Sequence, residues 1–267
     1  VDARLENGAR VNAVIAPVAL NGPILTVRRF PDRPVTMEKL ISLGSLPRQC
    51  AEFLAALVKA RYSMIIGGGT GSGKTTFLGA LSNYIPKDER LITIEDNAEL
   101  KIQGVENLVR MEAKMANMEG ASAITIRDLI RTALRMRPDR IIVGEVRGEE
   151  AVDMLQALNT GHEGSLSTAH ANSARDMLSR LETMTLMGMD LPLEAIRRQI
   201  ASGVDILIHL GRLRDKSRKV LEITEVCGFE NHEICTRTLY QWKDGCGLVK
   251  TAELFNREKL NRAGVKI

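Results

Sequence analysis

The sequence is poor in aromatic residues, paired cysteines and long apolar runs, and each shortage excludes a class of protein. Aromatic residues make up 3% of the 267 residues, whereas proteins that grip single-stranded nucleic acid usually combine a basic groove with aromatic stacking platforms. The four cysteines contain no CxxC pair, which fits reduced thiols in a cytosolic protein better than a disulfide framework or a zinc ribbon. No apolar run approaches the roughly 18 residues of a membrane span. We therefore expect a cytoplasmic protein for which nucleic acid is an unfavoured partner.

The remaining composition is that of an ordinary globular protein, with 44% hydrophobic and 26% charged residues and a mild net charge of +4. A chain of this length can form one large domain or two smaller ones, each with its own core. It begins with VDARLENGARVNAVIAP, which has no charged-then-apolar signal segment. We therefore expect a fragment whose native N-terminus is missing.

Three segments differ in pattern along the chain. Residues 1–35 contain RVNAVIA and ILTVRRF, two strand-like runs joined by a turn-rich segment, and predict a β-rich remnant of a smaller N-terminal domain. Residues 36–61 predict a linker and a connecting helix, with Pro47 at the start of the helix. Residues 62–267 alternate short apolar runs with amphipathic helices, which predicts an α/β domain.

In the α/β segment the apolar runs are nearly continuous, which favours a mainly parallel sheet covered by helices on both faces. The predicted strands are 63–68, 90–96, 107–111, 140–145 and 164–170, and the predicted helices are 74–84, 125–136, 148–159 and 173–187. After Asp205, the runs DILIHLGR, KVLEITEV and EICTRTLYQW resemble an antiparallel meander that closes the sheet edge.

The strongest functional motif is GGTGSGKT at residues 68–75, a complete G-x-x-x-x-G-K-[ST] match between a predicted strand and helix. Its glycines let backbone N–H groups turn inward around phosphates, and the following helix adds its positive N-terminal end. We expect Lys74 on the β- and γ-phosphates, the Thr75 hydroxyl on Mg²⁺ and Thr76 on the α-phosphate. The strand and helix context disfavours a glycine-rich turn without a ligand. The predicted nucleotide-binding residues are Gly69, Thr70, Gly71, Ser72, Gly73, Lys74, Thr75 and Thr76.

Two acidic segments follow strands of the same predicted sheet. RIIVGEVRG ends a buried strand in Glu145, and in a P-loop fold an acid at this place holds the Mg²⁺ shell or its water. LITIEDNAEL runs into Glu95, Asp96 and Glu99, which cannot all bind one ion without repulsion. We expect a division of labour in which one of them accepts a proton from the attacking water. Each segment by itself also fits an acid that faces solvent.

Two of the four histidines lie eight residues apart in TGHEGSLSTAHANS at residues 160–173. A helical zinc motif needs its histidines four residues apart, and Gly161 and Gly164 disfavour a helix here. An imidazole beside a nucleotide can instead hydrogen-bond a phosphate and lose that bond after hydrolysis. His162 and His170 are therefore candidates for phosphate sensing, with local packing as the alternative, above all for His162.

These segments resemble, in order and spacing, the Walker A, Asp box, Walker B and His box of the type II/type IV secretion ATPase superfamily. That group powers pilus assembly, DNA conjugation and protein secretion. The details resemble most the tight-adherence pilus (CpaF-like) branch, and the resemblance covers roughly residues 8–230. The matching segments are GGTGSGKTT, TIEDNAEL, RTALRMRPDRIIVGEVRG and TGHEGSLSTAHANSARD.

The resemblance implies a RecA-like C-terminal P-loop domain that hydrolyses ATP with Mg²⁺, a smaller N-terminal domain and a hexameric ring. It implies that Glu99 is the general base, with Glu95 or Glu145 as the alternatives, and that Glu145 serves the magnesium and water shell. His170, with His162 behind it, would sense the γ-phosphate.

LTVRRF resembles the strand of the family's N-terminal domain that carries a phosphate-facing arginine. Arg28, with Arg10 upstream, is therefore a candidate to neutralise transition-state charge, either in its own subunit or in a neighbour's site. A solvated strand edge is the alternative for the arginine pair Arg28 and Arg29.

Taken together, the resemblance implies a cytoplasmic homo-hexamer, peripheral at the inner membrane, that works with platform proteins of a pilus or secretion system. Two alternatives stay open. One is a nucleic-acid-dependent motor on the same fold, such as a helicase or DNA-transfer ATPase, which the low aromatic content and the His box disfavour. The other is a nucleotide-binding module that does not hydrolyse. The sequence does not identify the transported substrate.

Overall fold

The computed structural model describes residues 1–5, 8–29, 34–114, 116 and 122–267. The chain divides into two compact units, Val1–Pro34 and Val35–Ile267. Within the described residues, no helix is both long and apolar enough to cross a membrane.

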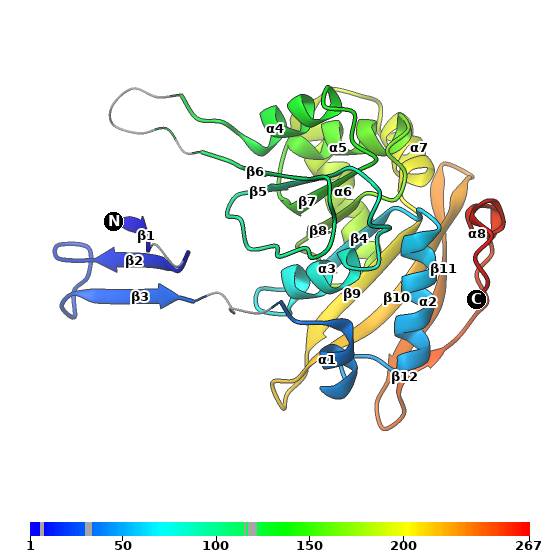
Figure 1. Ribbon diagram of the computed structural model, residues 1–267, viewed down its shortest axis with the longest axis horizontal. Helices are drawn as coiled ribbons and strands as arrows, with labels where there is room; N and C mark the ends of the chain where they lie inside the picture. The colour runs from blue at the N-terminus through cyan, green and yellow to red at the C-terminus, as the bar shows by residue number, and fades with distance from the viewer. Residues whose placement is uncertain (6–7, 30–33, 115, 117–121) are drawn as a thin grey trace. The chain divides into compact units, whose positions relative to one another are not determined.

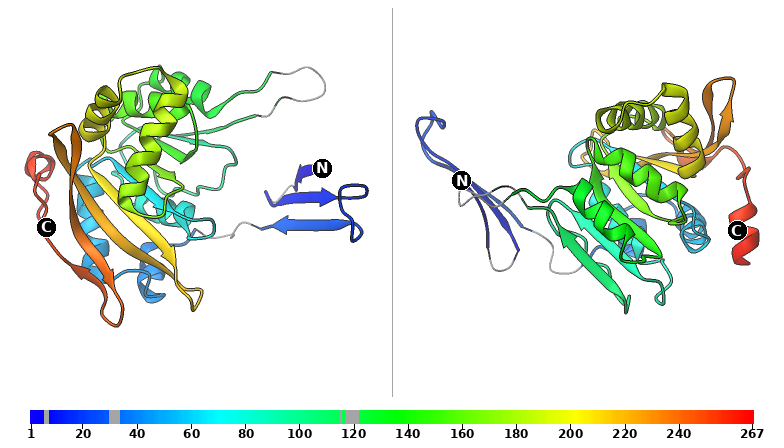
Figure 2. Two further views of the ribbon diagram at one scale, coloured as in Figure 1. Left: turned by 180° about the vertical axis from the view of Figure 1, so that it is seen from behind. Right: turned by 90° about the horizontal axis from the view of Figure 1, so that it is seen from above.

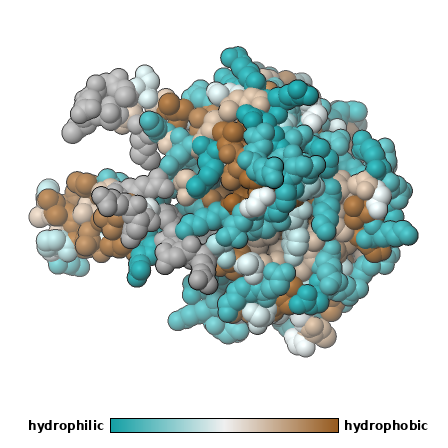
Figure 3. Space-filling view, viewed as in Figure 1, coloured by the Kyte–Doolittle hydropathy of each residue, from teal (hydrophilic) through white to brown (hydrophobic). Residues whose placement is uncertain are grey.

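The first unit is a three-stranded antiparallel sheet of β1 (Asp2–Arg4), β2 (Arg10–Val14) and β3 (Ile24–Arg28), in the order β1-β2-β3. Its described residues contain no helix that covers the sheet. Figure 3 shows hydrophobic side chains gathered on this unit. The large apolar residues that stay exposed include Ile15, Val18, Leu20, Ile24, Leu25 and Val27.

The second unit is built on a nine-stranded sheet with the order β12-β11-β10-β9-β4-β8-β7-β5-β6 (Figure 1). From β9 to β6 neighbouring strands are parallel, and β10 to β12 continue the sheet antiparallel. The mainly parallel α/β fold expected from the sequence is confirmed. The strands are β4 (Met64–Gly68), β5 (Leu91–Glu95), β6 (Leu108–Glu112), β7 (Arg140–Val146), β8 (Leu166–Ala169), β9 (Ile206–Arg212), β10 (Arg218–Glu230), β11 (Glu233–Lys243) and β12 (Gly247–Lys250).

The antiparallel meander expected after Asp205 is confirmed, because β9 pairs antiparallel with β10 and β10 pairs antiparallel with β11. Its first strand, β9, also pairs parallel with β4 and so lies inside the sheet, and β12 is the edge strand on this side. Ile206, Leu207 and Ile208 are completely buried. This continuous apolar run is typical of a strand covered on both faces.

Helices cover both faces of the large sheet (Figures 1 and 2). Because successive side chains of a strand point to opposite faces, β4 contributes Met64 and Ile66 to one core and Ile65 to the other. The helices of the first core are α1 (Met37–Ser42), α2 (Arg48–Lys59), α3 (Lys74–Ser82) and α8 (Glu258–Ala263), and those of the second are α4 (Ile126–Leu134), α5 (Glu150–Asn159), α6 (Ala174–Gly188) and α7 (Leu193–Gly203).

Polar side chains cap the starts of α4 and α6. The Thr125 hydroxyl accepts a hydrogen bond from the N–H of Asp128, whose carboxylate accepts the N–H of Thr125 in return, so that α4 begins with a capping box. Ser173 accepts the N–H of Asp176 and caps α6 in the same position. The second cap fixes where the chain leaves the histidine segment and becomes helical.

Candidate active site

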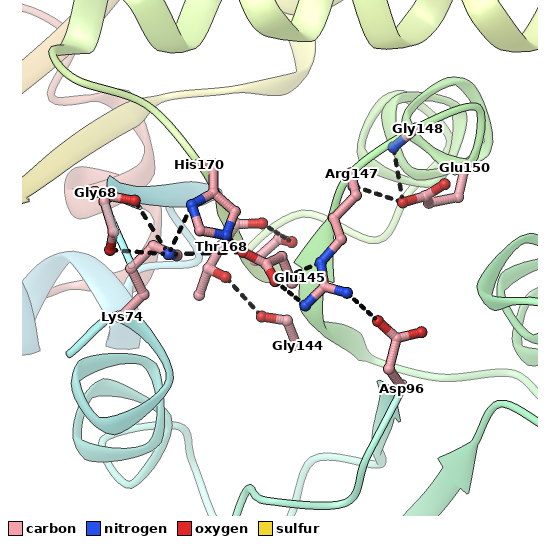
Figure 4. Close-up of polar contacts among 12 residues, drawn as sticks. Gly68, Lys74, Asp96, Gly144, Glu145, Arg147, Gly148, Glu150, Thr168 and His170 are labelled. Carbon is pink, nitrogen blue, oxygen red and sulfur yellow. Dashed lines mark hydrogen bonds and ion pairs between the residues drawn. The ribbon is translucent and has the colours of Figure 1, made fainter. Parts of the chain in front are cut away.

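The candidate site lies at the carboxyl ends of the neighbouring parallel strands β4, β8, β7 and β5. In open α/β sheets this edge is where ligands bind. The phosphate-binding loop follows β4, His170 follows β8, Glu145 is near the end of β7, and the acidic segment follows β5. The fold therefore brings four sequence motifs to one place, as the side chains in Figure 4 show.

The phosphate-binding loop requires glycine at several positions. A Cβ on Gly68 would lie 2.6 Å from the carbonyl oxygen of Leu210, and Gly71 and Gly73 have positive φ angles of 73° and 95°. Gly73 is also the N-cap of α3, which begins at Lys74. The first N–H groups of α3 therefore face the loop, as in anion-binding sites at helix N-termini.

Lys74 is the buried cation at the centre of the site. Its Nζ donates to the carbonyl oxygens of Gly68 (3.0 Å) and Gly69 (3.4 Å) and lies 3.6 Å from Oε1 of Glu145. Burial lowers the pKa of Lys74, while the Glu145 carboxylate acts in the opposite direction. The Lys74 ammonium thus donates to two carbonyl oxygens, and phosphate oxygens can take their place as acceptors when a nucleotide binds.

Glu145 joins three basic side chains. Its Oε1 lies 2.9 Å from Nε2 of His170, and its Oε2 accepts a hydrogen bond of 2.6 Å from Nε of Arg147. Arg147 also reaches the acidic segment, with its Nη1 3.0 Å from Oδ2 of Asp96. These contacts connect β7, β8 and the segment after β5 through one carboxylate (Figure 4).

The acids of the LITIEDNAEL segment have different surroundings. Glu95 is only 3% exposed, and its Oε1 accepts hydrogen bonds of 3.0 Å from the N–H groups of Glu99 and Leu100. Burial raises the pKa of the Glu95 carboxyl to about 7. A Cβ on Gly144 would lie 2.9 Å from Cγ of Glu95, so the bare backbone of β7 makes room for it. Glu95 therefore shapes the loop that carries the half-buried Glu99.

The two histidines lie in different places. Nδ1 of His170 is 3.5 Å from Nζ of Lys74, and burial lowers the pKa of its ring. A neutral ring with its proton on Nε2 suits these neighbours, since it donates to Glu145 and accepts from Lys74. His162 instead follows α5, where its Nδ1 lies 3.2 Å from the carbonyl oxygen of Ala157. That contact is the local packing considered above, and phosphate sensing by either histidine stays a prediction.

The expected magnesium ligands are compatible with the local chemistry. Thr75 is half-buried in the first turn of α3, whereas Thr76 is exposed. Among the described residues, no group of three or more histidine, cysteine, aspartate or glutamate side chains could hold a metal ion alone. Mg²⁺ at this site would therefore need oxygens of a nucleotide as ligands in addition to those of Thr75 and Glu145. Mg²⁺ prefers such hard oxygen ligands.

The two candidate trans-acting arginines belong to the first unit. Arg10 of β2 and Arg28 of β3 are direct partners in the antiparallel register, so their Cα atoms face each other across the strand pair. Their side chains therefore lie on the same face of this sheet. Their role in charge neutralisation stays a prediction.

Sequence reasoning missed two arginines that contact the site motifs. Arg147 stands two residues after Glu145, and its position in GEVRG was a usable signal. Arg218 donates a hydrogen bond of 2.8 Å from its Nε to the carbonyl oxygen of Gly71, although 147 residues separate the two. No local pattern could have connected Arg218 with the phosphate-binding loop.

Comparison with known proteins adds an independent observation. A family model described as type II/IV secretion system protein matches residues 1–260. A putative conjugal transfer protein of Mycobacterium tuberculosis is 44% identical over 216 residues, which are 80% of this chain and 60% of that protein. Conjugal transfer protein TrbB of Rhizobium radiobacter is 32% identical over 232 residues, which are 86% of this chain and 68% of that protein. The chain thus spans about 60% of the length of the first of these curated relatives.

Solved structures resemble the chain as well. The VirB11 ATPase from the Brucella suis type IV secretion system, in complex with sulphate, is 31% identical with a TM-score of 0.58, covering 84% of this chain and 75% of its own. The pilus retraction motor PilT with bound ADP has a TM-score of 0.60 at 23% identity, covering 98% of this chain and 66% of its own. At that identity, PilT supports the fold alone.

Proposed function

Because this chain belongs to the type II/IV secretion system protein family, we propose that it is a Mg²⁺-dependent ATPase that works as a homo-hexamer and powers pilus assembly or secretion. The observation that carries the proposal is the meeting of Lys74, Glu145 and His170 beside the phosphate-binding loop. We further propose a cytoplasmic location at the inner face of the membrane, with inner-membrane platform proteins as partners.

ATP binding uses the loop and Lys74. The β- and γ-phosphates take the Lys74 ammonium from the carbonyls of Gly68 and Gly69, and the first N–H groups of α3 bind the phosphate oxygens. Burial lowers the pKa of Lys74, and a bound phosphate raises it again because it adds a second negative charge beside that of Glu145. Lys74 is therefore cationic where negative charge develops.

Thr75 and Glu145 would hold Mg²⁺, which neutralises charge on the phosphates. Arg147 already occupies Oε2 of Glu145 and links it to Asp96. To serve the magnesium shell, Glu145 has to loosen this ion pair. Arg147 thus competes with the metal and can move toward Asp96 when ATP binds.

Glu99 is the proposed general base, in the role that the family resemblance implies. Glu95 holds the N–H groups of Glu99 and Leu100 and is buried, so it is better suited to position this loop than to exchange protons with water. Glu99 orients the attacking water for in-line displacement at the γ-phosphate.

His170 is the proposed γ-phosphate sensor. Its neutral ring can donate a hydrogen bond from Nε2 to a phosphate oxygen instead of to Glu145. This hydrogen bond is lost when the phosphate leaves after hydrolysis. His162, which contacts the end of α5, is a second proposed sensor from the same segment. Arg10 and Arg28 are the proposed arginines that neutralise charge in the same or a neighbouring subunit.

The proposal is tested by nucleotide binding and ATP turnover, measured separately. Lys74→Ala should lose nucleotide binding, whereas Glu99→Gln should bind ATP and hydrolyse it at least about a hundredfold more slowly, because a general base contributes roughly 10²- to 10⁴-fold. The rate per subunit should rise with protein concentration if sites are shared between subunits. Normal turnover by Glu99→Gln would move the base to Glu95 or Glu145.

A nucleic-acid-dependent motor is the second candidate, since two of the relatives are named conjugal transfer proteins. Single-stranded DNA should then stimulate ATP hydrolysis, and the stimulation should fall steeply with salt. A protein that binds ATP but shows no turnover at any concentration would instead be a non-hydrolysing assembly platform.

A further inference from the structure

The hairpin between β9 and β10 extends over the phosphate-binding loop. The parallel register pairs Gly68, the last residue of β4, with Leu210 of β9. Strand β9 continues to Arg212, which pairs with Arg218 at the start of β10. The hairpin therefore extends beyond the end of β4, on the side where the chain turns into the phosphate-binding loop.

Arg218 contacts this loop at its two left-handed glycines. Its Nε donates to the carbonyl oxygen of Gly71 at 2.8 Å. A Cβ on Gly73 would lie 3.3 Å from Cδ of Arg218, so the aliphatic part of the side chain rests on Gly73. One side chain thus covers both positions where the loop depends on a positive φ angle.

The hydrogen bond to the Gly71 carbonyl also affects the N–H of Ser72, which belongs to the same peptide group. In a trans peptide group the carbonyl oxygen and the N–H of the next residue point in opposite directions. The Gly71 carbonyl is held from outside by Arg218, while the N–H of Ser72 points across the loop to the carbonyl oxygen of Gly69 at 3.3 Å. A guanidinium that fixes the carbonyl thereby also fixes this N–H, and with it the turn from Gly69 to Ser72 in the phosphate-binding loop.

The hairpin itself is well anchored. At its tip the Asp215 carboxylate accepts the N–H and hydroxyl of Ser217 at 2.9 and 2.6 Å. At its base, Nζ of Lys219 donates to the carbonyl oxygen of Gly44 at 2.7 Å, and the N–H of Val220 donates to that of Ser45 at 2.9 Å. Arg218 therefore lies on a hairpin that is stabilised by hydrogen bonds within its own turn and by hydrogen bonds to the segment between α1 and α2.

We propose that Arg218 is a positioning residue that holds the phosphate-binding loop in its nucleotide-binding shape from the outer side. This role depends on one part of the proposed function, which is that the phosphate-binding loop binds nucleotide. It acts through the Gly71 peptide group, so it raises the affinity for the phosphates and leaves the fold of the ligand-free protein unchanged.

The test is the affinity for ADP without Mg²⁺, measured by calorimetry for wild type, Arg218→Ala, Arg218→Lys and Arg214→Ala. Arg214 is exposed in the same hairpin, so its variant removes the same charge without touching the loop. Arg218→Ala should bind ADP about tenfold more weakly, the size expected for loss of one charge-assisted hydrogen bond. Arg218→Lys, which can still donate to Gly71, should recover most of the affinity. Arg214→Ala should bind as the wild type does.

Three results would overturn this role. Equal ADP affinities of wild type and Arg218→Ala would exclude it, and equal weakening by Arg214→Ala would reduce it to general charge attraction. A lower melting temperature of Arg218→Ala without nucleotide, with an unchanged shift on adding ADP, would make the contact structural only. A wild-type protein that binds no ADP would instead overturn the proposed function and this role with it.

Discussion

Replacing Glu95 by glutamine should change how the stability of the protein depends on pH. Glu95 is 3% exposed, and burial raises the pKa of its carboxyl from 4.5 to about 7. Between these values the folded protein keeps a proton on Glu95 that the unfolded chain has released. The free energy of unfolding therefore falls as pH rises from 4.5 to 7, and the contribution of Glu95 is constant above that interval.

The size of the effect follows from the two pKa values. A difference from 4.5 to about 7 corresponds to about 3 kcal/mol, since one pKa unit corresponds to about 1.4 kcal/mol. Glutamine is neutral at every pH, and its carbonyl oxygen can still accept the N–H groups of Glu99 and Leu100. The Glu95→Gln protein should therefore lack this loss of about 3 kcal/mol, so its stability relative to the wild type should increase between pH 5 and 8.

Urea denaturation followed by circular dichroism at pH 5, 6, 7 and 8 measures this difference directly. The other titrating groups are common to both proteins and cancel in the comparison. Glu106→Gln makes the same chemical change at an exposed position and should leave the pH profile as in the wild type. Parallel profiles for wild type and Glu95→Gln would refute the inference that burial raises the pKa of Glu95 to about 7.

Further predictions concern a buried ion pair, a close backbone contact and the metal. Arg140 is fully buried and binds Glu89 through contacts of 2.6 and 2.8 Å, so Arg140→Ala should lower the free energy of unfolding by about 3–5 kcal/mol; a loss below 1 kcal/mol in urea titrations would contradict this. Gly188→Ala should destabilise by about 1–3 kcal/mol, because its Cβ meets backbone atoms of Glu149, and an unchanged melting temperature would argue against it. Arg147→Ala should lower the Mg²⁺ concentration for half-maximal ATP hydrolysis, since a competitor for Glu145 is removed; a higher requirement would mean that Arg147 assists the metal.

The sequence was informative wherever a motif needs only local geometry. The phosphate-binding loop is recognisable because its glycines and Lys74 are contiguous, and a strand must precede it and a helix follow it. The alternation of apolar runs and helices likewise predicted the parallel sheet, since buried parallel strands are apolar along their whole length. The parallel pairing of β9 with β4 could not be predicted, because an apolar run has the same pattern whether its neighbours are parallel or antiparallel.

The sequence by itself determined the α/β fold, the family and the four segments that carry the candidate chemistry, because each depends on residues close together in the chain. Only the tertiary structure decided which groups meet. The Glu145 carboxylate lies between His170 and Arg147, Glu95 is buried beneath the loop of Glu99, and Arg218 reaches the phosphate-binding loop. Such contacts depend on strand order and register, which set the distances between segments that are remote in sequence. These distances decide which site residues form ion pairs, which carboxyl group keeps its proton and which shape the phosphate-binding loop adopts.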